Sequence, residues 1–207
     1  MSTTHGSVTF NEISETHSTW VIKYCSPTFN NPLFLIWYTD TDKNSTDKLL
    51  TYKNGKIFAT DSLNDLKSKL RSENKDLIWF DNLNIWLENS NNLAAVEYCT
   101  YDLISLTNEL DAGNMNDTLL GDFVDFINLY RDFVNQHPNN LHLRVYSHSN
   151  ALKKIWNYYY DFTFWPSYEK PDEAQHSKKP KLGISSKKIA SLLKELQRTF
   201  EENLQLN

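Results

Sequence analysis

The stretch LLTYKNGKIFATDSLNDLKSKL, residues 49–70, decides how the first half of the chain folds. Two short runs rich in apolar and β-branched residues flank the dipeptide Asn54-Gly55. Asn-Gly is the pair most typical of a type I′ turn, because both of its residues adopt positive φ angles at low cost. Residues 49–60 are therefore predicted to form a β-hairpin.

Further elements are expected around this hairpin. Apolar residues recur at helical spacing over 61–70, behind an Asp and a Ser that can each cap a helix. Residues 19–25 and 33–38 are rich in β-branched and aromatic side chains, and residues 77–80 are apolar enough for a buried strand. The first half is thus predicted to be an antiparallel sheet with one packed helix.

The spacing of apolar residues changes from about two to about 3.6 after residue 93, which favours helices. The clearest predicted helix begins at Asp117 and ends at His137-Pro138, since apolar side chains recur between them at three- and four-residue steps. Other helices are expected over three further segments. These begin at Tyr101, at Ser149, and at Ser185 or Ser186.

The fold class that these patterns predict is α+β, with a mainly helical C-terminal half after the sheet. All 207 residues are assigned to one domain, sheet-rich over about 1–92 and helical over about 93–207. The segment 141–146 suits a short strand or an extended connector equally. The aromatic run 158–165 is expected to lie in the core and at the rim of an interface.

Composition limits the possible functions. The longest apolar run has six residues, far below the roughly 20 that span a bilayer, and the first residues lack the pattern of a signal peptide. We therefore expect a cytoplasmic protein without membrane contact. The five glycines form no nucleotide-binding motif, and no cofactor or metal is expected. Cys25 and Cys99 are expected to be buried thiols.

No catalytic signature is present, because the histidines form no H-E-x-x-H motif and no serine lies in G-x-S-x-G. Two alternatives to a binding protein stay open. An enzyme site could assemble from dispersed residues such as His142, His148 and Asp161, which would require a deep cleft. A regulatory module could instead use the apolar stripe of residues 189–200 as a ligand, provided that the stripe is exposed.

Charge is unevenly distributed along the chain, whose formal net charge is -5. Residues 76–136 contain eleven acidic side chains and a single basic one, Arg131. On the predicted helix in this segment, Asp122, Asp125 and Asp132 lie opposite the apolar stripe. Such a face attracts a basic partner and speeds its association, and it should repel nucleic acid. A merely solvated helix face explains the same pattern equally well.

Strand, Asn-Gly turn and helix over 49–66, within a small acidic protein, resemble immunity proteins of bacterial contact-dependent and other polymorphic toxin systems. The resemblance implies a non-enzymatic protein that binds the toxin domain of its own system and blocks the active site or substrate path. Toxins of this class are often basic nucleases, whose phosphate-binding surface would complement an acidic patch. Candidate contacts are Asp102, Glu109, Asp111, Asp117, Asp122, Asp125 and Asp132, with Tyr101 and Tyr130 as aromatic anchors.

Overall fold

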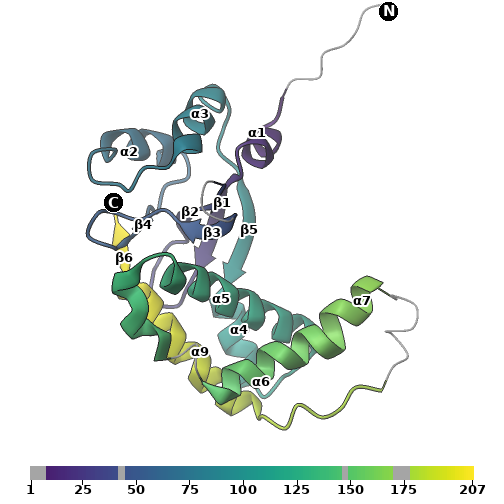
Figure 1. Ribbon diagram of the computed structural model, residues 1–207. Coiled ribbons are helices and arrows are strands. Elements are labelled where there is room, and N and C mark those ends of the chain that lie inside the picture. Colours follow the sequence, from purple (N-terminus) through teal and green to yellow (C-terminus); the bar gives the residue numbers. More distant parts are fainter. Residues whose placement is uncertain (1–7, 42–44, 146–148, 170–177) are drawn as a thin grey trace, which may run out of the picture. The chain divides into compact units, whose positions relative to one another are not determined.

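The chain forms two compact units in the computed structural model (Figure 1). We call Met1–Tyr101 with Asn203–Asn207 the sheet unit, and Asp102–Glu202 the helical unit. The sheet unit contains the strands together with some helices, and the helical unit consists mainly of helices, which gives the α+β class that the sequence predicts. The residues that the structure describes are 8–41, 45–145, 149–169 and 178–207.

The sheet unit is built on four strands in the order β3-β2-β1-β5. Neighbouring strands pair antiparallel from β1 to β3, with Val21 opposite Ile36. The arrows of β1 and β5 point the same way in Figure 1, so the sheet is mixed. Residues 97–102 were expected in the helical half but form a strand. The bounds are β1 Thr19–Cys25, β2 Leu33–Asp40, β3 Thr46–Leu49 and β5 Glu97–Asp102.

The predicted hairpin forms, but the predicted turn type is wrong. Thr51 bridges Ile57 across the hairpin. Within its turn, all of which the structure describes, only Gly55 has a positive φ, +85°, whereas a type I′ turn needs two. The Asn54 Oδ1 accepts a hydrogen bond from the Lys56 N–H at 2.9 Å. This contact fits a three-residue loop that ends on a left-handed glycine.

A strand that the sequence analysis missed completes the sheet unit. Strand β6, Leu204–Leu206, pairs parallel with β4, Ile57–Ala59. The Ile57 N–H also donates to the Asn203 carbonyl at 2.7 Å. Three residues are too few to show a strand periodicity, and the pairing partner lies at the other end of the sequence.

Three helices accompany the sheet: α1 Phe10–Thr16, α2 Leu66–Ser72 and α3 Asp81–Asn89. Helix α2 begins later than predicted, because Ser62 accepts a hydrogen bond from the Asp65 N–H at 3.2 Å and so caps a turn. The predicted strand 77–80 is wrong, since Leu77 forms only an isolated bridge with Tyr52. Cys25 and Cys99 are half-buried rather than buried.

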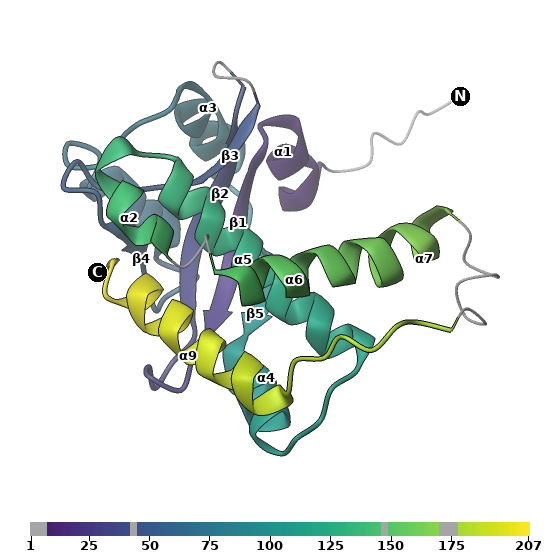
Figure 2. The same cartoon turned by 60° about the horizontal axis from the view of Figure 1, so that its bottom comes forward.

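The helical unit is organised around α5 (Figure 2). Its elements are α4 Leu103–Asp111, α5 Asp117–Asn135, the 3₁₀ helix η1 Pro138–Val145, α6 Asn150–Tyr159, the π-helical turn η2 Tyr160–Phe164, α7 Trp165–Glu169 and α9 Ser186–Glu201. The N-cap of α5 is Asn116 rather than Asp117, because the Asn116 Oδ1 accepts the Leu119 N–H at 2.9 Å. Segment 141–146 enters η1 and is neither a strand nor extended up to residue 145.

The apolar stripe of the C-terminal helix is part of the core. Phe200 contacts the rings of Phe126 and Phe133 edge-on at centroid distances of 5.7 and 6.1 Å. Leu193 and Leu196 are also buried. The stripe is therefore not available as an exposed ligand helix in this structure. No helix among the described residues is long and apolar enough to cross a membrane.

We predict that Gly55→Ala lowers the free energy of unfolding by about 1–2 kcal/mol, because an alanine Cβ disfavours a left-handed backbone. Gly55→Asn should cost less, since asparagine tolerates this conformation. Urea denaturation of both variants measures the difference. Equal stability of Gly55→Ala and the native protein would contradict the turn described here.

Candidate partner-binding surface

Three carboxylates of the helical unit lie close enough for their charges to interact. Asp102 caps α4, where its Oδ1 accepts the Ser105 N–H at 3.0 Å. Asp122 and Asp125 are exposed on α5. Asp102 acts electrostatically on Asp122, and Asp122 on Asp125. Two helices thus bring together three of the acidic residues that the sequence analysis proposed as contacts.

The carboxyl groups of Asp122 and Asp125 both have a pKa above the ordinary value of 3.8. Although both residues are exposed, neighbouring protein atoms displace part of the water around each carboxyl, and this desolvation is the largest cause because it disfavours the charged form. Repulsion from Asp102 then raises the pKa of Asp122, and repulsion from Asp122 raises that of Asp125. No described Lys or Arg forms an ion pair with either group. The fold therefore holds two carboxylates in an environment that disfavours their charge.

Gly121 allows Tyr159 of α6 to lie directly on this face of α5. A Cβ at position 121 would be 3.0 Å from the Tyr159 Oη, so any larger residue would displace the ring. The pKa of the Tyr159 hydroxyl is raised, first by burial and then by nearby negative charge, of which Asp125 contributes most. Asp122 and Asp117 contribute less. Tyr159 therefore stays protonated beside the carboxylates.

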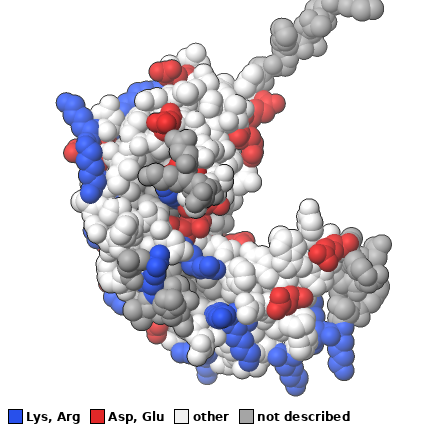
Figure 3. All heavy atoms as spheres, in the orientation of Figure 1, with Lys and Arg blue, Asp and Glu red and all other residues white. Residues whose placement is uncertain are grey.

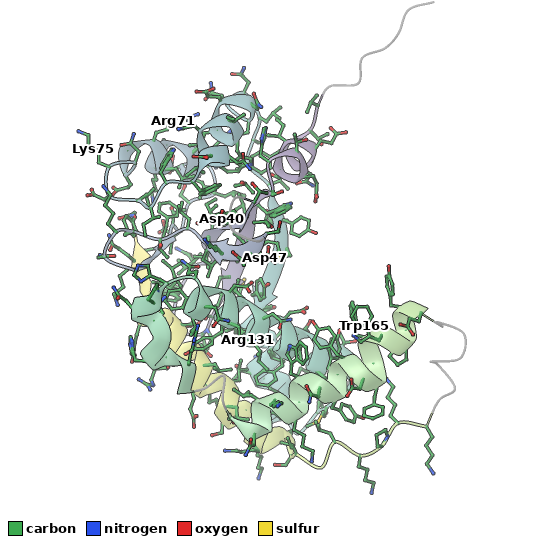
Figure 4. All side chains as sticks on the ribbon, in the orientation of Figure 1. Asp40, Asp47, Arg71, Lys75, Arg131 and Trp165 are labelled. Carbon is green, nitrogen blue, oxygen red and sulfur yellow. The ribbon has the colours of Figure 1, made fainter. Side chains whose placement is uncertain are left out.

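Exposed aromatic rings continue from Tyr159 along the chain. The centroid of Phe164 is 6.3 Å from that of Tyr159, 4.9 Å from that of Trp165 and 6.3 Å from that of Tyr168. Trp165 is 48% exposed and Tyr168 is 76% exposed, and Figure 4 shows Trp165 on α7. The π-helical turn η2 ends at Phe164 and changes the helical register before Trp165 and Tyr168. Phe164, Trp165 and Tyr168 are all exposed.

We call these neighbouring groups the acidic–aromatic surface. It consists of Asp102, Asp117, Asp122, Asp125, Tyr159, Phe164, Trp165 and Tyr168. Its acidic members are among the contacts predicted from the sequence, whereas Tyr159, Phe164 and Trp165 were predicted to lie in the core and at the rim of an interface. Tyr168 falls in a segment predicted to be a surface loop, but it lies in α7. The aromatic residues at positions 164 and 168 are four residues apart, which is the spacing of neighbours on one helix face. The π turn before this face, however, leaves no signature in the sequence.

Several other predicted contacts have polar partners within the chain. Asp111 pairs with Lys194, whose Nζ is 2.9 Å from the Asp111 Oδ2. Asp117 forms an ion pair with Lys179 and so contributes less net charge to the acidic–aromatic surface. Glu109 accepts a hydrogen bond from a neighbouring asparagine amide. Asp111 and Asp117 thus have ion-pair partners that Asp122 and Asp125 lack among the described residues.

The predicted aromatic anchors are not confirmed as a pair. Tyr130 is only 1% exposed, and its hydroxyl donates to the Leu143 carbonyl at 3.1 Å. It is a core residue, so its prediction as a surface anchor is wrong. Tyr101 is half-buried in β5 of the sheet unit. Asp132, the third acid of the predicted α5 face, is half-buried rather than exposed.

The residues proposed for a dispersed enzyme site are only partly described. His148 lies outside the described residues. The His142 Nδ1 is 2.8 Å from the Asn139 carbonyl oxygen, and Asp161 lines a pocket in which no described histidine takes part. Among the described residues, no group of three or more His, Cys, Asp and Glu side chains is placed to hold a metal ion.

The fold and this surface define an α+β protein with an acidic and aromatic face on its helical unit. One solved structure, titled the crystal structure of the SatS C-terminal domain in complex with bromine, is similar to it with a TM-score of 0.53. The alignment covers 94% of this chain and 96% of that chain, at 14% sequence identity. At this identity the likeness supports the fold alone. No protein-family model and no curated protein matches the sequence.

We predict that Asp125→Asn and Asp122→Asn each raise the melting temperature at pH 7. Each amide removes a charge that the fold disfavours, so the folded state gains stability wherever the native carboxyl is ionised. The gain should disappear as the pH falls below 3.8, where the carboxyl is protonated in both folded and unfolded chains. Thermal melts over this pH range measure it.

Asp111→Asn serves as the matched control. It also replaces an aspartate by its amide, but it breaks the ion pair with Lys194 and should lower stability by about 0–1 kcal/mol at pH 7. If Asp122→Asn and Asp125→Asn lower the stability as the control does, the charges of these two carboxylates do not destabilise the folded protein.

Proposed function

We propose that this chain is a cytoplasmic immunity protein that binds a basic cognate toxin domain, of the nuclease type, and neutralises it without catalysis. One observation carries the proposal: the carboxylates of Asp122 and Asp125, which lack an ion-pair partner among the described residues, lie next to exposed aromatic rings. The family resemblance of residues 49–66 supplies the class of partner, and the acidic–aromatic surface supplies a place for it.

In the free protein, Asp122 and Asp125 are partly desolvated and repel each other. A lysine or arginine from a partner would remove this repulsion and donate charge-assisted hydrogen bonds. The desolvation cost has already been met in part during folding, so less remains to be met on binding. A basic surface therefore gains more at this site than at acids that are already paired within the chain.

The exposed aromatic rings would add to the affinity that charge provides. Large rings such as Trp165 and Tyr168 usually contribute more affinity than charges at the rim of an interface. The contacts of Phe164 with both rings order them before a partner arrives, which reduces the entropy lost on binding. Charge would thus steer the encounter, and the rings would determine how long the complex lasts.

Neutralisation would follow from occlusion. A nuclease binds its substrate through cationic side chains that contact phosphates. Carboxylates of the acidic–aromatic surface would occupy those cations, and the bound chain would exclude the nucleic acid by its volume. This mechanism requires no cofactor and no direct contact between this protein and nucleic acid.

We predict that the double reversal Asp122→Lys, Asp125→Lys slows association with the cognate toxin domain by roughly tenfold or more at low salt, because steering depends on these charges. Stopped-flow binding measures the rate. The control Asp76→Lys, Glu88→Lys makes the same charge change at two exposed positions of the sheet unit. If both double variants slow association equally, the effect depends on the net charge of the protein and not on the positions of Asp122 and Asp125, which would contradict this prediction.

We also predict that Trp165→Ala and Tyr168→Ala each speed dissociation of the complex by up to about 30-fold, the effect of losing an anchor worth about 2 kcal/mol. Tyr98→Ala removes a ring that is 52% exposed in the sheet unit and should leave dissociation unchanged. Surface plasmon resonance gives the rates. The proposed function requires that a toxin domain encoded beside this gene bind the native chain and that the chain protect cells expressing that domain; absence of such a gene, of binding or of protection would refute it.

A further inference from the structure

The helical unit contains a cavity of about 480 Å³ bordered by α5, η1, α6 and α9. Its floor is apolar, since Ile127, Leu152 and Leu196 are almost fully buried. Its volume lies within the about 300–1,000 Å³ typical of small-molecule sites. No part of the acidic–aromatic surface lines it, so it is a separate feature of this unit.

Cationic side chains surround this floor. Arg131, the single base of the acidic segment, lines the cavity together with Arg144 and Lys153. Within the described part of the chain, neither Arg131 nor Lys153 has an ion-pair partner. The protein thus places three positive charges around one hollow although its formal net charge is -5.

Arg131 is held in a defined position. Its guanidinium lies 5.5 Å from the ring centroid of Trp156, between α5 and α6 (Figure 4). The Trp156 Nε1 donates to the Asn128 Oδ1 at 2.9 Å, which fixes the indole. A guanidinium that lies over a ring uses its face there and keeps its in-plane N–H groups for acceptors. The cavity is therefore partly organised for an anion before one binds.

Lysine and arginine side chains also gather along the lower edge of the helical unit in Figure 3, over α6 and the segment that leads to α9. A second, shallower pocket there is lined by Lys153, Lys154 and Lys181 against one acid, Asp161. The two pockets share Lys153 and Asn157. An anion that approaches the cavity would therefore meet a positive surface before it reaches Arg131.

We propose that this cavity binds a small organic phosphate of about nucleotide size. An uncharged apolar ligand would cover the cations without satisfying them, which is costly. An inorganic anion would leave the apolar floor exposed to water. A phosphate joined to an apolar or planar body meets both requirements, because guanidinium groups match phosphate oxygens in geometry and the body covers the floor. This site is independent of the proposed toxin binding.

Isothermal titration calorimetry of the full chain tests the proposal with three probes: AMP, adenosine and inorganic phosphate. AMP should bind at least tenfold more tightly than either of the other two. The variant Arg131→Met, Lys153→Met should weaken AMP binding at least tenfold. The control Lys187→Met, Lys188→Met makes the same charge change at exposed positions of α9 outside the cavity and should leave AMP binding within twofold of the native value.

Three results would overturn the proposal: no AMP binding at millimolar concentration, equal losses in the two double variants, or equal affinity for AMP and inorganic phosphate. If the cavity variant melts before the native chain and does not fold, Lys153→Glu alone is measured, since Lys153 is exposed on α6. Loss of AMP binding in that variant supports the site, and unchanged binding overturns it.

Discussion

The burial of α5 is the constraint on which the rest of the helical unit depends. Eleven of its nineteen residues are buried, so the helix contacts neighbours on most of its circumference. Phe126 and Phe133 of α5 enclose Phe200 of α9, while Gly121 admits Tyr159 of α6. The polar residues of α5 are therefore confined to a narrow strip of the helix surface, so only a few sequence positions of the helix can carry a charged side chain.

This confinement explains why opposite charges occupy different parts of the same helix. Asp122 and Asp125 lie near one another and near Tyr159, without a cation to compensate them among the described residues. Arg131 instead lies over Trp156 and beside an apolar cavity. Ion pairs between these aspartates and a basic residue of the same helix would stabilise the fold more. Their absence is a local loss of stability of the kind that functional surfaces often show.

The sequence predicted the features that depend on local pattern. The α5 helix, strands β1 and β2 and the hairpin around Gly55 follow from apolar spacing and turn chemistry within one window. Strand β6 did not, because its existence depends on a partner far away in the sequence. The acids of the surface were found by counting charge, whereas the exposure of Trp165 and Tyr168 depends on a π turn that residue pattern does not indicate.

The central claim is that Asp122 and Asp125 are held in an unfavourable charged state that a basic partner relieves. NMR titration of their side-chain carboxyl groups, in the free protein and with the toxin domain bound, measures this directly. The account predicts a pKa above 3.8 for both groups in the free protein and a lower pKa for both in the complex. Ordinary values in the free protein, or values that binding leaves unchanged, would contradict it.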